Sequence, residues 1–440
     1  MAMARMTESM AMKRLWALAC FGILALAMGA TLRAQQFALK DGDTVVFYGD
    51  SITAQRLYTR DVEEFVLTRY PQMHIRFVNA GVPGDTVNGG YAGTMQERVR
   101  RDVAPYQPTM ITVMLGMNDG GWGYGDAQTE PAFQKGFRAV LDELHKAAPD
   151  AALTIISPTP YDEITHGTEF PGYSRVIDKF ADDVSAIGAE LEASGQKNIA
   201  TADFHHRMTN ALERANSKFP ALAPLMIPDR IHPAPAGHWI MAAALMSAWH
   251  VDPIVSSLEL NADNASVIAK ARTTVSDLKR TENGLMWTQT DDALPLPLDL
   301  NDAMTPVLLA VSDVSQLDQL MLRVESLRTG RYELSIDGKS IATFSSEELQ
   351  RGVNLALYKT PMLAQARGID GNEDERTALD RARFILTADV KEAPTTAIAQ
   401  ATLRQAEGDF ETSIRASLNP HPHKFELQRK TDAAAGGIGR

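Results

Sequence analysis

The stretch TVVFYGDSIT, residues 44–53, decides the fold of the first half of the chain. Residues 44–48 are β-branched, aromatic or aliphatic, and such a run predicts a buried strand. The Gly-Asp-Ser sequence that follows ends the strand and opens a helix, of which Ser51 taken alone would be the N-cap. We therefore expect a strand that turns directly into a helix, with Ser51 at the junction.

Working outward from this stretch, the chain alternates short strand-like runs with longer helical patterns. The further strands are predicted at residues 75–79, 110–115, 153–157 and, more weakly, 199–203. Apolar residues recur at helical spacing between the later strands, at Phe133, Phe137, Val140, Leu141 and Leu144 and again at Val176, Phe180, Val184, Ile187 and Leu191. The pattern predicts an α/β fold from about residue 40 to 250, with a mostly parallel sheet covered by helices on both faces.

Polar segments follow the predicted strands at their carboxyl ends. They are residues 49–53, 79–86 and 116–119, joined by residues 229–232 before the last helix of this half. Ligands of open α/β sheets bind outside the carboxyl ends of the strands. We therefore expect the four segments to meet at one site.

These segments contain the residue types of a serine hydrolase. A serine hydroxyl needs a base that a third group orients, and Asp229 lies three residues before His232. We predict Ser51 as the nucleophile, His232 as the general base and Asp229 as its partner. The backbone of Ser51, the backbone at Gly84 and the amide of Asn118 would form the oxyanion hole.

The four segments, in this order, resemble the SGNH or GDSL hydrolase family over roughly residues 40 to 250. The matched positions are Ser51, Gly84, Asn118 and His232, with Asp229 three residues before the histidine. The resemblance implies a flavodoxin-like three-layer fold that hydrolyses esters and thioesters without metal or cofactor. Any one segment alone would be a helix cap or a turn, but four in the right order favour catalysis. Residues 347–362 resemble a C-terminal extension of some bacterial members.

The glycine-rich segment GGWGYG, residues 120–125, follows Asn118 and carries Trp122 and Tyr124. The two rings would form either a stacking platform for a sugar or buried anchors of the loop. We expect hydrolysis of small acyl esters, with O-acetyl groups of carbohydrates as the preferred substrate. A lipase or thioesterase of the same fold, which would need an apolar groove, is the first alternative. A catalytically inactive carbohydrate-binding protein is the second.

Composition and charge limit the partners. With 440 residues, 45% of them hydrophobic and 22% charged, the chain is typical of a soluble protein of two domains. A formal net charge of -12 disfavours nucleic acid and anionic lipid as primary partners. The single cysteine, Cys20, precludes an internal disulfide, and the histidines lack metal-site spacing, so no metal is expected. The oligomeric state stays open.

The sequence also predicts an export signal and the boundaries of the domains. Residues 1–34 are typical of an export signal, with Lys13 and Arg14 before the apolar residues 15–30. We therefore expect a periplasmic or extracellular protein without a membrane span in the mature chain. An uncleaved membrane anchor is the alternative. Residues 38–252 would form the catalytic domain, residues 257–430 a smaller C-terminal α+β domain of unknown role, and residues 431–440 a disordered tail.

Within the C-terminal part, a polar helical stretch is expected after Asp252-Pro253, leading to Trp287. Asp337-Gly338 predicts a hairpin between residues 332–336 and 340–344. Ser345 and Glu348 form a capping box that opens a helix. Further helices are expected around residues 373–388 and 396–417, and a last strand at 424–428.

Overall fold

The computed structural model describes residues 36–196, 198–369, 376–379, 381–383, 385–386 and 394–430. The chain divides into two units, Met1–Ala38 and Leu39–Arg440, and every element below belongs to the second. The expected export signal and C-terminal tail lie outside the described residues. Among the helices of the described ranges, none is both long and apolar enough to cross a membrane.

A parallel sheet forms the centre of the first half. Its strands, in spatial order, are β2 (Arg76–Gly81), β1 (Thr44–Gly49), β5 (Met110–Met114), β6 (Ala152–Ile156) and β7 (Ile199–Ala202). Numbered along the chain, this is the flavodoxin-like order 2-1-3-4-5. All five predicted strands are confirmed, with ends that differ by at most two residues from the predicted ends.

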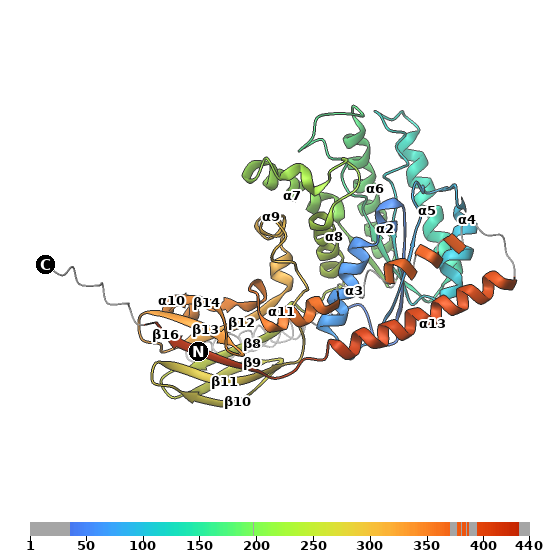
Figure 1. Ribbon diagram of the computed structural model, residues 1–440. Helices are drawn as coiled ribbons and strands as arrows, with labels where there is room; N and C mark the ends of the chain where they lie inside the picture. The colour runs from blue at the N-terminus through green and yellow to red at the C-terminus, as the bar shows by residue number, and fades with distance from the viewer. Residues whose placement is uncertain are drawn as a thin grey trace, which may run out of the picture. The chain divides into compact units, whose positions relative to one another are not determined.

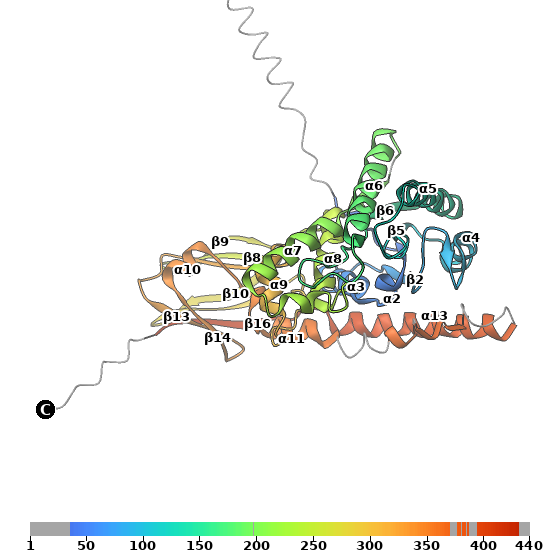
Figure 2. The same cartoon turned by 90° about the horizontal axis from the view of Figure 1, so that it is seen from above.

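Helices cover both faces of this sheet (Figures 1 and 2). On one face α3 (Leu57–Arg69) packs against α8 (Pro235–Ala248), and α8 packs against α7 (Phe204–Lys218). The other group contains α5 (Thr129–Ala147) and α6 (Tyr173–Ala193), which pack against each other. The helical stripes predicted on α5 and α6 are buried, except that Leu191 near the end of α6 is half-buried. The expected three-layer fold is confirmed.

The C-terminal half is built on two β-sheets. The first has the order β10 (Thr273–Arg280), β11 (Gly284–Asp291), β16 (His423–Arg429), β13 (Arg331–Ile336) and β14 (Lys339–Ser345). The second has the order β15 (Val353–Asn354), β12 (Gln319–Glu325), β8 (Ile254–Asn261) and β9 (Ser266–Ala271). Residues of both sheets, among them Leu258, Trp287, Leu322 and Phe425, share one hydrophobic core.

The remaining elements include several short helices and strands and the long helix α13. They are α2 (Ser51–Ala54), β3 (Gly89–Gly90), β4 (Gly93–Thr94), α4 (Met95–Arg98), the π-helix η1 (Val99–Val103), the 3-10 helices η2 (Ala104–Tyr106), η3 (Ala223–Met226), η4 (Val314–Leu317), η5 (Leu355–Leu357) and η6 (Arg367–Ile369), and α9 (Thr305–Val311), α10 (Ser346–Arg351), α11 (Pro361–Ala366) and α13 (Pro394–Ser417).

The predicted polar helical stretch after Asp252-Pro253 is wrong, because β8 to β11 occupy most of residues 254–291. Burial alternates along β11, where Leu285, Trp287 and Gln289 point inward. Such period-2 burial is the mark of a strand with one solvated face. Because some of the buried residues of β11, such as Gln289, are polar, the sequence does not show the alternation of apolar and polar residues that would predict this strand.

Other C-terminal predictions are confirmed. β13 and β14 form the hairpin around Asp337-Gly338, and Ser345 and Glu348 form the capping box of α10. The helix expected at 396–417 is α13, and the last strand is β16. The helix expected at 373–388 lies partly outside the described residues. The domain boundaries stay predictions.

Two arginines from the C-terminal half cover the outer edge of β2. Arg376 donates to the carbonyl of Phe77 at 3.2 Å, and Arg383 donates to the carbonyl of Asn79 at 3.3 Å. The guanidinium of Arg376 also contacts the buried carboxylate of Glu63 in α3. Since β2 is an edge strand of the parallel sheet, these side chains satisfy backbone carbonyls that have no neighbouring strand.

Candidate active site

Ser51 is the first residue of α2 and follows β1 after only one intervening residue. That residue, Asp50, caps the helix, because its carboxylate accepts the backbone N–H of Ile52 at 3.0 Å. The close approach of α2 to the sheet requires glycine at the carboxyl ends of β1 and β2. A Cβ on Gly49 would lie 2.2 Å from Thr53 Oγ1, and one on Gly81 would lie 2.3 Å from the backbone nitrogen of Ala54. The sequence GDS therefore holds the serine at the carboxyl edge of the sheet.

A continuous hydrogen-bond chain joins the three residues predicted as a triad. His232 Nε2 is 2.8 Å from Ser51 Oγ, and His232 Nδ1 is 2.7 Å from Asp229 Oδ2. The carboxylate has no proton to give, so Nδ1 donates to it and Nε2 accepts from the serine hydroxyl. This is the tautomer that a general base for Ser51 requires.

The other carboxylate oxygen of Asp229 organises its own loop. Asp229 Oδ1 accepts the backbone N–H of Ile231 at 3.0 Å and that of His232 at 2.7 Å. Partial burial raises the pKa of the Asp229 carboxyl, but the hydrogen bonds from His232 and Ile231 lower it further, and the net pKa is below its ordinary value. The carboxylate stays ionised and its two oxygens have separate functions.

Arg230, between the two triad residues on this loop, has a left-handed backbone with φ of 71°. Its guanidinium donates to the carbonyl of Gly167 at 2.9 Å and pairs with Glu169 at 2.9 Å. Its carbonyl accepts the backbone N–H of Asp162 at 2.9 Å. The loop after β6 therefore holds the backbone that carries Asp229 and His232, a function that no feature of the sequence indicated.

The residues predicted for the oxyanion hole follow neighbouring strands. Gly49 of β1 pairs with Gly81 of β2 and with Met114 of β5, so the segments beyond these strands start side by side. Gly84 has φ of 73°, a conformation that favours glycine. Asn118 Nδ2 donates to the carbonyl of Asp85, the residue that follows Gly84, at 3.0 Å. The amide of Asn118 therefore lies against the Gly84 loop.

Three buried carboxyl groups, those of Asp50, Asp85 and Asp119, surround these segments. Burial raises the pKa of Asp50 to about 7 and that of Asp119 to about 7. Asp119 Oδ1 accepts the backbone N–H of Val87 at 3.0 Å and so fixes the Gly84 loop to the loop after β5. Like the cap formed by Asp50, this is a structural function, as expected for side chains that accept backbone N–H groups.

Asp85 has a partner that the sequence analysis missed. Its carboxylate contacts the fully buried guanidinium of Arg98, which also donates to the carbonyl of Ala80 and lies 4.8 Å from the ring of Tyr48. Burial raises the pKa of Asp85 to about 6, although Arg98 opposes the shift. The only available signal was the spacing of four between Arg98 and Asp102, which form a second ion pair.

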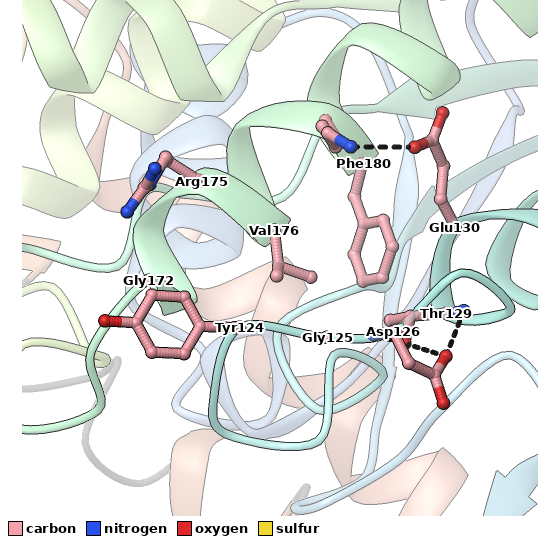
Figure 3. A pocket seen from close by; sticks show the side chains of 10 residues that line it. Tyr124, Gly125, Asp126, Thr129, Glu130, Gly172, Arg175, Val176 and Phe180 are labelled. Atoms are coloured by element: carbon pink, nitrogen blue, oxygen red, sulfur yellow. Dashed lines mark hydrogen bonds and ion pairs between the residues drawn. The ribbon is translucent and has the colours of Figure 1, made fainter.

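Trp122 and Tyr124 lie in different surroundings. Trp122 stacks on Tyr173 with ring centroids 4.9 Å apart and lies 5.5 Å from Phe170. Tyr124 is 70% exposed and borders a cavity between the loop and α6 (Figure 3). This cavity does not include Ser51 or His232. A function in substrate binding stays a prediction for both rings.

Comparison with known proteins identifies the family. Residues 47–240 match the model of the GDSL-like lipase/acylhydrolase family. The chain therefore contains a GDSL-like lipase/acylhydrolase domain over these residues. The acylhydrolase is accordingly a carboxylic ester hydrolase. Within the described part of the chain, no group of three or more His, Cys, Asp or Glu side chains is arranged to hold a metal ion.

Individual relatives resemble different lengths of the acylhydrolase. An acetylxylan esterase from Geobacillus stearothermophilus is 25% identical over 234 residues, which are 47% of this chain and 93% of the relative. A solved structure of a gut microbial diltiazem-metabolizing enzyme has a TM-score of 0.76 at 22% identity and covers 90% of this chain and 99% of its own. A solved structure of the Geobacillus esterase has a TM-score of 0.39 at 22% identity, over 49% of this chain and 97% of its own. The fold of the diltiazem-metabolizing enzyme thus extends over both halves of the acylhydrolase.

Proposed function

We propose that this acylhydrolase is a serine esterase that removes small acyl groups, with O-acetyl esters of carbohydrates as its substrate class. The observation that carries the proposal is the hydrogen-bond chain from Asp229 through His232 to Ser51, with distances of 2.7 and 2.8 Å. A serine becomes a nucleophile when a correctly oriented base takes its proton. His232 lies within hydrogen-bond distance of Ser51 and of Asp229, which orients its ring, and this supports the proposal.

In the first half of the reaction, Ser51 Oγ attacks the acyl carbon and its proton passes to His232 Nε2. The imidazolium that forms is stabilised by the carboxylate of Asp229. When the tetrahedral intermediate collapses, the bond to the alcohol oxygen breaks and His232 returns the proton to that oxygen. The alcohol leaves, and the acyl group remains as an ester of Ser51.

The negative oxygen of the intermediate needs donors that are fixed before the reaction. The backbone N–H of Ser51 lies in the first turn of α2, where N–H groups have no acceptor within the helix. The backbone N–H of Gly84 and the amide of Asn118 are the other proposed donors. Asn118 keeps one N–H for this purpose, since its hydrogen bond to Asp85 uses only one of two.

In the second half, water attacks the acyl carbon of the ester. His232 Nε2 takes a proton from the water, the bond to Ser51 Oγ breaks, and the proton passes to Ser51. The products are the carboxylic acid and the regenerated serine. The same donors stabilise the second tetrahedral intermediate.

The acyl and alcohol groups are inferred from the relative and from the loop chemistry. The relative with 25% identity is named an acetylxylan esterase, and the matched region spans 93% of its length. The loop that follows Asn118 adds Trp122 and Tyr124 on a glycine-rich backbone, which suits a flat polar alcohol such as a sugar.

The nucleophile is tested with a fluorophosphonate probe and mass spectrometry of the labelled peptide. We expect labelling at Ser51 that Ser51→Ala abolishes and His232→Ala slows strongly, because an unactivated serine reacts slowly with the probe. His206→Ala, at an exposed histidine that pairs with Asp203, is the matched control and should leave labelling unchanged. Undiminished labelling in Ser51→Ala would refute the assignment.

The acyl preference is tested with p-nitrophenyl esters of increasing chain length. We expect acetyl to give the highest or nearly the highest kcat/KM. A lipase would instead gain up to ~0.8 kcal/mol for each CH₂ buried in an apolar groove. A steady rise from acetyl to octanoyl would overturn the small-acyl proposal and leave the nucleophile assignment intact.

A further inference from the structure

A cavity of about 210 Å³ lies between the loop that follows Asn118 and the start of α6. One wall is formed by residues 124–130 and the other by residues 172–180 (Figure 3). Its volume is below the range of sites for drug-sized ligands, so it has room for a single ring and little more.

The exposed wall of the cavity is the ring of Tyr124, which lies against the backbone of Gly172. A Cβ on Gly172 would be 2.2 Å from the ring, and Gly172 has φ of 82°, so glycine is required on both grounds. The guanidinium of Arg175 is 5.9 Å from the ring centroid. An aromatic surface and a cation therefore face the same space (Figure 3).

The charged groups that line the cavity are paired, with one exception. Lys179 pairs with Glu130 at 3.2 Å. Asp126 accepts the backbone N–H groups of Gln128 at 2.9 Å and of Thr129 at 3.0 Å. Within the described ranges Arg175 has no hydrogen bond or ion pair, and its contact is with the ring of Tyr124. The cavity therefore offers one positive charge without a counter-ion.

The cavity belongs to the same loop as the proposed oxyanion residue. A second cavity, of about 150 Å³, is lined by Asn88, Asp119 and Gly121 and shares Thr129 with the first. Tyr173, at the start of α6, donates its hydroxyl to the carbonyl of Met117, the residue before Asn118. The first cavity thus borders the loop that carries Asn118, although neither Ser51 nor His232 lines it.

We propose that this cavity is a subsite for the alcohol part of the substrate and binds a sugar ring that carries a carboxylate, a uronic acid. The ring would stack on Tyr124 and the carboxylate would pair with Arg175, because a guanidinium binds a carboxylate through two parallel hydrogen bonds. The proposal rests on the proposed function, since it specifies the carbohydrate whose acetyl group is removed. The net charge of -12 repels an acidic polysaccharide at long range, so recognition requires a local cation such as Arg175.

The subsite is tested by calorimetric binding to the Ser51→Ala protein, which separates binding from turnover. The two probes are a xylo-oligosaccharide with one glucuronic acid branch and the same oligosaccharide after reduction of its carboxyl group. We expect the acidic probe to bind at least about tenfold more tightly than the reduced probe, and Arg175→Gln to abolish this difference. Arg138→Gln, which removes an exposed arginine that pairs with Glu190, is the matched control and should keep the difference.

Equal affinity for the two probes, or a difference that survives Arg175→Gln, would overturn the subsite. Hydrolysis then distinguishes the two proposals. With acetylated versions of both probes, the ratio of their kcat/KM values should fall in Arg175→Gln by about the same factor as the affinity ratio. Arg175-dependent binding without deacetylation by the unsubstituted protein would refute the proposed function and leave the subsite standing.

Discussion

The guanidinium of Arg230 lies 2.9 Å from the carboxylate of Glu169, and this pair connects the loop of Asp229 and His232 to the loop after β6. We expect Arg230→Ala to lower kcat with little change in KM, because the triad would be held less firmly while substrate contacts remain. The loss should be on the order of tenfold, below the roughly hundredfold cost of a 1 Å misplacement, since the backbone bond from Asp162 remains. Steady-state kinetics on p-nitrophenyl acetate measures both constants.

Arg230→Gly separates the ion pair from the backbone strain. Glycine accepts φ of 71° without penalty, whereas alanine retains a cost of roughly 1 kcal/mol or more. Arg230→Gly should therefore be more stable to denaturant than Arg230→Ala and similar to it in kcat. A full kcat in both variants would show that the connection to Glu169 does not position the triad.

Asn118→Ala should lower kcat with little effect on KM, because the oxyanion forms only in the transition state. Loss of one such donor costs on the order of a hundred- to a thousandfold, or ~3 to 4 kcal/mol. Asn118 also donates to the carbonyl of Asp85, so the melting temperature of the variant must be measured as well. A loss below about tenfold, together with lower stability, would assign Asn118 to loop support alone.

Asp50→Asn should change the pH dependence of stability. Burial raises the pKa of Asp50 to about 7, so between about pH 4 and pH 7 the folded protein binds a proton that the unfolded chain has lost. The free energy of unfolding contributed by Asp50 therefore falls as pH rises through this window. Asparagine stays neutral and still accepts the N–H of Ile52, so it avoids this loss.

The measurement is the melting temperature of Asp50→Asn minus that of the unsubstituted protein, from about pH 5 to about pH 8. We expect this difference to increase with pH. Asp150→Asn, at an exposed carboxyl outside the site, is the control and should give no such increase. A constant difference for Asp50→Asn would contradict a raised pKa at this position.

Arg376→Met should destabilise the protein, because it removes a buried cation beside Glu63 and a donor to the carbonyl of Phe77. Loss of one partner of a buried pair costs about 3 to 5 kcal/mol, and Arg56, which also binds Glu63, should reduce the loss to about 2 kcal/mol. Arg381→Met, at an exposed position of the same segment, is the matched control. Equal denaturation midpoints for the two variants would mean that the edge of β2 gains nothing from Arg376.

The fold of the first half was accessible from the sequence because the central parallel strands are buried on both faces and therefore contain nearly continuous apolar runs, whereas β7, the weakest prediction, is mostly half-buried. β1 and β5 are buried along almost their whole length, and the polar segments that follow them stand out. That the segments containing Ser51, Gly84 and Asn118 start side by side followed from the parallel register alone. The contact between Ser51 and His232 spans 181 residues and was predictable only through the order of the four segments.

Other features depend on packing that no local pattern reports. Strands β9 and β10 are largely exposed and rich in Ser, Thr and Lys, so their alternation is weak. The ion pair between Arg98, the last residue of α4, and Asp85 joins residues that are 13 positions apart in the sequence. The different environments of Trp122 and Tyr124 are determined by Tyr173 and Gly172, which lie about fifty residues further along the chain.

The arginines that cover β2 are synthesised long after the strand itself. Arg376 is made 299 residues after its acceptor Phe77. At typical synthesis rates, roughly 15 to 60 seconds separate the emergence of the two residues from the ribosome. During that interval a nascent chain that already contains Ser51 has an open sheet edge, to which a strand of another nascent chain could add. Ribosome spacing and chaperone supply should therefore affect the yield of soluble enzyme more strongly than the stability of the finished protein would suggest.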